Sequence, residues 1–162
     1  MKASIAVASS VAVQSTQDVS SSRVYGLLLP PWVDWTATDE ATAMEAFTAK
    51  LTALRRESPV LHRDQFYVDG EVLWWDPSGR PMEPDDWHDG GRQTLVVLLA
   101  DYWLLLLHAG DEPVDCLLPT DHDFDPVLDS TTADGEPADP APIGPGATVV
   151  LPPRSVRLLR TR

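Results

Sequence analysis

The sequence predicts a mainly β protein, an antiparallel β-sandwich preceded by one amphipathic α-helix. A helical period of apolar residues occurs only between residues 38 and 59. From residue 66 onward the pattern changes to short apolar runs separated by Pro, Gly and Asp. Short strands at this spacing, joined by turn residues, are typical of antiparallel sandwiches.

The composition indicates a folded, acidic protein. A hydrophobic fraction of 43% with 6 Trp is too apolar for a disordered chain, although 25 acidic against 12 basic residues give a net charge of −13. This charge would repel nucleic-acid phosphates and anionic lipids, which are bound through Lys and Arg clusters. We therefore expect no nucleic-acid and no membrane partner, and a neutral partner such as a sugar or a protein.

Residues 1–31 are predicted to be a poorly ordered tail, because their Ser, Ala and Val follow no useful helical or alternating period. Their start resembles a secretory signal only faintly, since serines interrupt the apolar segment. The richest apolar stretch, 95–107, is broken by Asp101 and falls short of the roughly 20 residues of a membrane helix. The single cysteine, Cys116, is expected to be a small buried side chain. These features predict a cytoplasmic protein.

The helix is expected to begin after Thr38, a good N-cap, and to end before Pro59. Its apolar positions form one stripe: Met44, Phe47, Leu51 and Leu54. Burial of four such side chains is worth on the order of 6 to 12 kcal/mol. We therefore expect the stripe to pack on the sandwich, on the amino-terminal tail or on another chain.

The expected strands follow in order along the rest of the chain. They are Val72–Trp75, Leu95–Ala100, Tyr102–His108, Val114–Leu118, Asp125–Asp129, Thr148–Leu151 and Ser155–Leu159. Ala100 and Asp101 are predicted to form a tight hairpin between two central strands. Arg154, Arg157 and Arg160 predict a charged solvent face for the last strand, which would discourage edge pairing.

Five short sequence motifs follow one another along the chain from residue 32 to residue 155. They are Trp32–Trp35; Phe47–Val60; Trp75–His88; Leu104–Pro119, which reads LLLLHAGDEPVDCLLP; and Leu151–Ser155. Together they resemble the carboxyl-terminal end of bacterial glycogen-debranching enzymes of the isoamylase type, members of the α-amylase superfamily of glycoside hydrolases. In this resemblance, Phe47–Val60 is similar to the last helix of the catalytic barrel.

The resemblance implies that residues 32–65 are the remnant last barrel helix and residues 66–162 the C-terminal β-sandwich domain. The catalytic carboxylates of the family lie upstream of every matched segment. The resemblance therefore implies a truncated member that lacks the catalytic barrel and has no glycosidase activity by itself. Residues 27–31 read LLLPP where the family has a polar stretch, so no catalytic or substrate-binding residue is carried over. We expect no cofactor.

Tryptophan is the best candidate for ligand binding. Trp74 and Trp75 are neighbours on an expected strand, so they face opposite sides and one can be exposed. An exposed indole, together with Trp87, could stack on a glucose ring and form a weak carbohydrate site. In the alternative, that indole packs with Trp87 beneath the segment 82–88.

Other chemistry is not favoured by the sequence. Asp85 and Asp86 are adjacent and point in different directions, so they are not expected to cooperate in glycoside hydrolysis, which needs two facing carboxylates. His122 lies between two aspartates, a pattern better explained by a solvated turn than by a metal site. We predict neither a catalytic residue nor a metal site.

Three functions remain in contest. The first is a non-catalytic fragment of the debranching family. The second is a free-standing glycogen- or starch-binding module, and the third is the C-terminal part of an active glycosidase completed by another chain. The expected partner is an α-glucan or a glucan-processing enzyme that contacts the stripe of Met44, Phe47, Leu51 and Leu54.

Overall fold

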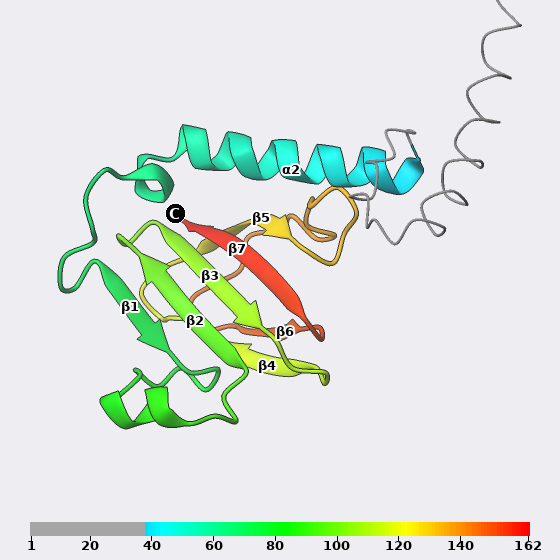
Figure 1. The fold of residues 1–162 in the computed structure, drawn as a ribbon. Coiled ribbons are helices and arrows are strands. Elements are labelled where there is room, and N and C mark those ends of the chain that lie inside the picture. The colour runs from blue at the N-terminus through cyan, green and yellow to red at the C-terminus, as the bar shows by residue number, and fades with distance from the viewer. Residues whose placement is uncertain (1–37) are drawn as a thin grey trace, which may run out of the picture. The chain divides into compact units, whose positions relative to one another are not determined.

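The computed structural model describes residues 38–162, and the expected tail, residues 1–31, lies outside this range. The described residues form helix α2 (Asp39–Glu57), the 3₁₀ helices η1 (Pro59–His62) and η2 (Pro84–His88), and strands β1 (Val72–Trp75), β2 (Thr94–Leu99), β3 (Trp103–His108), β4 (Val114–Leu117), β5 (Phe124–Asp129), β6 (Thr148–Leu151) and β7 (Ser155–Thr161) (Figure 1). Each expected strand is present with small shifts at its ends. Within this part of the chain, no helix has the length and apolar character needed to cross a membrane.

The strands form two antiparallel sheets. The larger sheet has five strands in the order β1-β2-β3-β7-β5, and the smaller has two, β4 and β6. Within residues 38–162 the fold is therefore mainly β with a single α-helix, and the predicted antiparallel architecture is confirmed.

The main core lies between the two sheets. Alternate residues of β2 and β3 point into it from the larger sheet, as the period of two along a strand requires. Residues of and just after β4, and of β6, face them from the smaller sheet. The fully or nearly fully buried members are Val96, Leu98, Leu104, Leu106, Cys116, Leu118, Phe124, Val149, Leu151 and Leu159.

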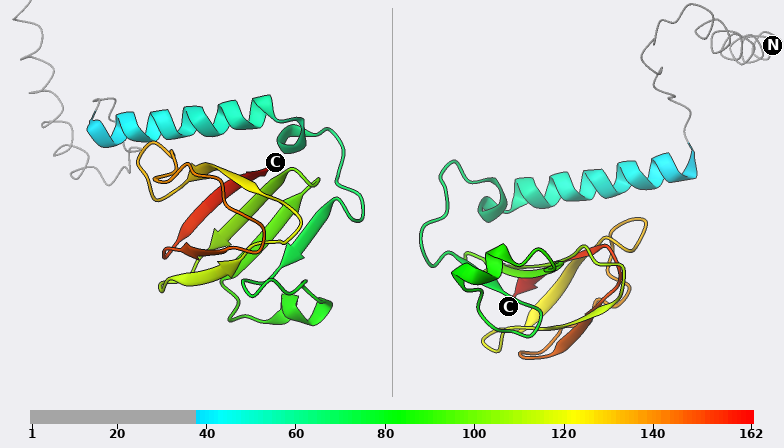
Figure 2. Two further views of the ribbon diagram at one scale, coloured as in Figure 1. Left: turned by 180° about the vertical axis from the view of Figure 1, so that it is seen from behind. Right: turned by 60° about the horizontal axis from the view of Figure 1, so that its bottom comes forward.

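Helix α2 covers part of the other face of the larger sheet, which gives three layers (Figure 2). Phe47 and Leu54 pack there against a second core cluster formed by Trp103, Leu128 and Leu158. The indole Nε1 of Trp103 donates a hydrogen bond of 2.6 Å to the Oγ of Ser58, at the end of α2. The helix is thus fixed by both apolar contacts and a buried polar contact.

The apolar stripe of α2 packs on the sandwich only in part. Phe47 and Leu54 lie two turns apart and contact the sheet, whereas Met44 is 65% exposed and Leu51 is 42% exposed. Compared with a helix whose whole stripe faces the sheet, α2 is rotated so that Lys50 also faces the sandwich, where its Nζ donates to the carbonyl of Gly135 at 2.9 Å. This rotation turns one side of the stripe toward solvent.

The hairpin between β2 and β3 forms where it was predicted. Ala100 and Asp101 have positive φ angles of 48° and 55°, and the N–H of Tyr102 donates to the carbonyl of Leu99 at 3.0 Å. Positive φ at both central residues is the geometry of a type I′ turn, which suits the twist of a two-stranded ribbon. Both strands are interior, as expected.

The prediction for the last strand is wrong, because β7 is an interior strand between β3 and β5. Alternation along the strand places Arg157 and Arg160 on opposite faces, so they cannot form one charged face. Both are paired with β5: the Nε of Arg157 lies 2.8 Å from Asp129, and Arg160 lies 3.3 Å from Asp125. These arginines join two strands rather than protect an edge.

Candidate functional site

The tandem tryptophans of β1 point to opposite faces of the larger sheet. Trp75 packs against the main core. Trp74 lies on the other face, opposite Val97 in the strand register, and remains 37% exposed. The structure thus leaves Trp74 at the surface and gives Trp75 a role in packing.

Trp74 forms an aromatic pair with Trp87 of η2, which is 51% exposed. Their ring centroids lie 5.2 Å apart and the planes meet at 83°. This edge-to-face arrangement is one that aromatic quadrupoles favour. The two alternatives for the exposed indole therefore coexist, since Trp74 packs on Trp87 while both keep solvent-exposed surface. We call Trp74 and Trp87 the indole pair.

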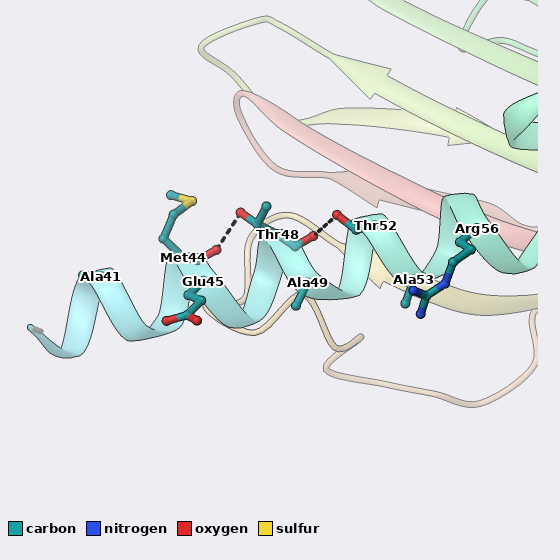
Figure 3. A pocket seen from close by; sticks show the side chains of 8 residues that line it. All are labelled: Ala41, Met44, Glu45, Thr48, Ala49, Thr52, Ala53 and Arg56. Carbon is teal, nitrogen blue, oxygen red and sulfur yellow. Dashed lines mark hydrogen bonds between the residues drawn. The ribbon is translucent and has the colours of Figure 1, made fainter. Parts of the chain in front are cut away.

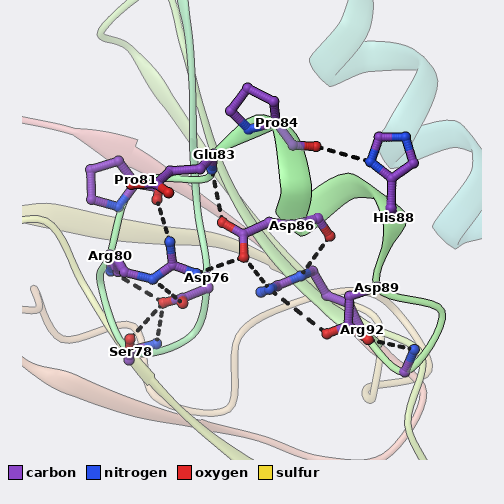
Figure 4. A network of polar contacts seen from close by, with 11 residues as sticks. Asp76, Ser78, Arg80, Pro81, Glu83, Pro84, Asp86, His88, Asp89 and Arg92 are labelled. Atoms are coloured by element: carbon purple, nitrogen blue, oxygen red, sulfur yellow. Dashed lines mark hydrogen bonds and ion pairs between the residues drawn. The ribbon is translucent and has the colours of Figure 1, made fainter.

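Asp86, next to Trp87, is the centre of a polar network (Figure 4). Its Oδ1 accepts hydrogen bonds from Arg80 at 2.7 Å and Arg92 at 2.9 Å, and its Oδ2 accepts the backbone N–H of Glu83 at 2.8 Å. The hydrogen bond from Arg80, followed by that from Glu83, lowers the pKa of Asp86 to about 2. The carboxylate is therefore ionised at neutral pH and ties η2 to both flanking segments.

A second carboxylate shapes the turn that leads from β1 to η2. Asp76 is buried, and its Oδ1 accepts hydrogen bonds from the N–H and hydroxyl of Ser78 and from the N–H of Arg80. Gly79 takes a φ of +82° in this turn, a conformation that favours glycine. Burial raises the pKa of Asp76, but the hydrogen bonds from Ser78 and Arg80 outweigh it and the net shift is downward.

The helical period of η2 determines which side chains flank Trp87. In a 3₁₀ helix, residues three positions apart stack above one another. Trp87 therefore lies in line with Pro84, and His88 in line with Asp85. All three of these flanking side chains are exposed. The exposed surface of η2 thus combines Trp87 and Pro84 in one row with the polar side chains of Asp85 and His88 in another.

This arrangement favours binding over acid–base chemistry. A glycosidase acid needs a raised pKa so that it stays protonated near neutrality. The pKa values of Asp76 and Asp86 are both lowered, and each carboxylate is already engaged by hydrogen bonds. Within residues 38–162, no group of three or more His, Cys, Asp or Glu side chains is placed to hold a metal ion.

The remaining candidates of the sequence take part in local contacts. His122 lies 2.8 Å from the carboxylate of Asp101 at the β2–β3 hairpin, and its ring meets Phe124 edge to face. Cys116 is buried in the main core, and burial, followed by the charge of Asp115, raises its pKa to about 11. A thiol with this pKa is a poor nucleophile at neutral pH.

A surface depression lies elsewhere, on the outer side of α2 (Figure 3). It is an open groove of about 720 Å³. Its walls are Ala41, Met44, Glu45, Thr48, Ala49, Thr52, Ala53 and Arg56. The hydroxyls of Thr48 and Thr52 donate to carbonyls one turn back along the helix, so they are already engaged.

In the part of the chain that the structure describes, these features define an antiparallel β-sandwich domain with helix α2 and a surface indole pair. Residues 67–138 match a family described as "Glycogen debranching enzyme C-terminal domain". Residues 67–138 thus resemble the C-terminal domain of glycogen debranching enzymes, and the chain resembles the carboxyl-terminal portion of isoamylase-type enzymes, as its sequence predicts.

Curated relatives agree with this match. The chain is 42% identical over 90 residues to a glycogen debranching enzyme of Cronobacter sakazakii, and 37% identical over 90 residues to one of Yersinia pseudotuberculosis. Each alignment covers 54% of this chain and 13% of the relative. The matched region is therefore a small part of these enzymes.

Solved structures give a weaker likeness. The trehalulose synthase MutB from Pseudomonas mesoacidophila MX-45 aligns with 70% of this chain and 17% of its own, at 18% identity and a TM-score of 0.44. The same enzyme in its sucrose-bound E254Q form gives 19% identity and the same TM-score. At this TM-score the likeness supports no conclusion about function.

Sequence reasoning found the indole pair but missed the residues that hold it. Arg80, Asp86 and Arg92 recur at intervals of six residues across segments of different structure, so no helical or strand period relates them. The available signal was the presence of two arginines in an otherwise acidic segment. Their convergence on one carboxylate depends on the path of the turn after β1.

Proposed function

We propose that this chain acts in α-glucan debranching as a truncated, non-catalytic member of the glycogen-debranching family. The observation that carries the proposal is the match of residues 67–138 to the C-terminal domain of these enzymes. A second observation supports the non-catalytic role: Asp76 and Asp86, which follow Trp75 and precede Trp87 in the sequence, have lowered pKa values and are paired with arginines. Bond cleavage then belongs to a different domain or chain.

An assay of the purified 162-residue chain with glycogen tests the proposal. We expect no increase in reducing ends, while a bacterial debranching enzyme in a parallel tube releases linear oligosaccharides. Adding the chain to that enzyme should alter its rate on glycogen and leave its rate on a short soluble branched oligosaccharide unchanged. Release of oligosaccharides by the chain alone would show that it is a glycosidase and overturn the proposal.

A second proposal concerns a protein partner. We infer that the outer side of α2 contacts a glucan-processing enzyme, because Met44 and Leu51 are exposed and Met44 lines the open groove on this side. We place the proposed contact at Met44 and Leu51, because Phe47 and Leu54 are partly buried against the sandwich of the same chain.

Substitution within the groove tests the partner contact. Met44→Glu should weaken co-sedimentation of the chain with a purified debranching enzyme, because it adds a charge to an apolar contact. Glu57→Ala changes an exposed residue of the same helix outside the groove and serves as the control. Equal co-sedimentation of all three proteins would contradict the proposal.

We further propose that the protein acts in the cytoplasm, where glycogen is processed. The lone cysteine supports this location, because disulfide frameworks are typical of secreted chains. Fractionation of cells that express the chain should recover it with cytoplasmic markers, and recovery in the culture medium would contradict the proposal.

A further inference from the structure

We propose that the indole pair, Trp74 and Trp87, is a binding platform for a glucose unit of a neutral α-glucan chain. The choice of an α-glucan rests on the proposed function above, whereas the platform itself rests on the geometry of the described residues. The site would hold the polysaccharide at the surface of the domain.

The first support is the exposure of two adjacent indoles. Single exposed apolar residues are common on protein surfaces, but adjacent large ones mark binding sites more often. Trp103 shows the contrast within the same sheet, because it is 3% exposed and its Nε1 is bonded to Ser58. Trp74 and Trp87 keep 37% and 51% of their surface in contact with solvent.

The second support is the angle between the rings. Because the planes meet at 83°, the edge of one indole rests against the other and the pair forms a corner. The C–H groups on one side of a pyranose ring carry small positive charge, and an indole face is negative. A glucose unit can therefore stack on one indole while its rim touches the other.

The third support is the rigid attachment of both indoles to one frame. The N–H of Met82 donates to the carbonyl of Trp74 at 2.9 Å, which ties the segment before η2 to β1. Arg80 and Arg92 hold Asp86, the residue next to Trp87. A preformed site loses less conformational entropy on binding, and this favours affinity.

The fourth support is the chemistry around the corner. Asp85 and His88 are exposed on η2 and can exchange hydrogen bonds with sugar hydroxyls, whereas Pro84 extends the apolar surface in line with Trp87. A net charge of −13 disfavours anionic ligands such as nucleic acids and sugar phosphates. A neutral ligand with apolar ring faces and a polar rim fits these surroundings.

Binding of the full chain to glycogen tests the platform. The wild-type protein should be retarded in a native gel that contains glycogen, and titration with maltoheptaose should change its tryptophan fluorescence. Trp87→Ala and Trp74→Ala should each weaken binding about tenfold or more, comparable with the loss of one stacked aromatic contact. Trp87→Phe should retain part of the affinity, because it keeps an aromatic face.

Tyr102→Ala is the matched control. Tyr102 is 41% exposed and makes a similar edge-to-face pair with Trp103, at 5.2 Å and 82°, but it lies at the β2–β3 hairpin. Binding by this variant should equal that of the wild type. Thermal unfolding of each variant shows whether it is folded, and the Trp87→Phe comparison remains informative if an alanine variant is not.

The outcomes separate this proposal from the proposed function. Retention that is lost in the tryptophan variants and kept in Tyr102→Ala supports the platform. Absence of glucan binding, or binding that the tryptophan substitutions leave unchanged, overturns it. Neither of these binding results tests the proposed non-catalytic role. That role is contradicted by a different observation, the release of oligosaccharides from glycogen by the chain alone.

Discussion

At the scale of single residues, Asp86 holds the segment that carries Trp87, because it accepts hydrogen bonds from Arg80 and Arg92. Its pKa falls from an ordinary value of 3.8 to about 2, first because Arg80 donates to it and then because Glu83 does. A lowered pKa means that the folded state favours the ionised form. The stabilisation is complete above about pH 4 and is lost as the pH falls through about 2.

The lowered pKa of Asp86 predicts a pH-dependent stability. Asp86→Asn should lower the free energy of unfolding at pH 7, and the difference in this free energy between variant and wild type should shrink between about pH 4 and pH 2. Denaturant unfolding across this range measures it. Asp85→Asn, which changes an exposed neighbour outside these ion pairs, is the control and should change the free energy of unfolding at pH 7 less than Asp86→Asn does. A gap for Asp86→Asn that stays constant down to pH 2 would contradict the role of the ion pairs.

Ser58 is a second residue with a defined contribution. It is buried at the end of α2, where its Oγ accepts the Nε1–H of Trp103 at 2.6 Å. Ser58→Ala leaves this donor buried without a partner and should cost about 1–3 kcal/mol of unfolding free energy. Thr52→Ala, which removes an exposed hydroxyl from the same helix, should cost less than about 0.5 kcal/mol. Equal losses in urea unfolding would argue against the buried hydrogen bond.

At the scale of elements, the β2–β3 hairpin carries a local conflict between residue type and conformation. Ala100 has a φ of 48°, and a non-glycine residue in this region costs about 1–2 kcal/mol. Ala100→Gly should therefore raise the free energy of unfolding, by up to about 1 kcal/mol after the entropy of glycine is subtracted. Ala109→Gly, just after β3, should lower it or leave it unchanged. A loss of stability in Ala100→Gly would show that the methyl group contributes more than the strain.

At the scale of the whole molecule, β7 lies outside the segment that matches the family but pairs with two strands inside it. The matched segment ends at residue 138, before β6 and β7. Yet β7 lies between β3 and β5 in the larger sheet, and within the described residues β5 has no other strand partner. The matched segment is thus not a complete folding unit by itself.

Truncation tests this dependence. A chain that ends at residue 138 should lose cooperative thermal unfolding, because β3 and β5 lose their shared neighbour and the main core loses Leu151 and Leu159. A chain that begins at residue 38 retains both sheets and should keep a single cooperative transition. Near-ultraviolet circular dichroism during heating compares the two. A sharp transition in the chain ending at residue 138 would contradict this prediction.

The sequence by itself determined the local elements and the resemblance to a known family. The helix start at Thr38, the hairpin at Ala100 and Asp101, and the position of each strand depend on residues close together in the chain, so their patterns can be read locally. The ordered motifs also sufficed for the resemblance to debranching enzymes, which the match of residues 67–138 confirms.

The tertiary structure alone decided which elements became neighbours. The insertion of β7 between β3 and β5, the separation of β4 and β6 into a second sheet, and the rotation of α2 all depend on contacts between distant residues. The same holds for the candidate site, since the alternation of β1 required Trp74 and Trp75 to face opposite sides but not which one would meet the core. Strand pairing and the packing of two faces set that choice, and neither is encoded in a local period.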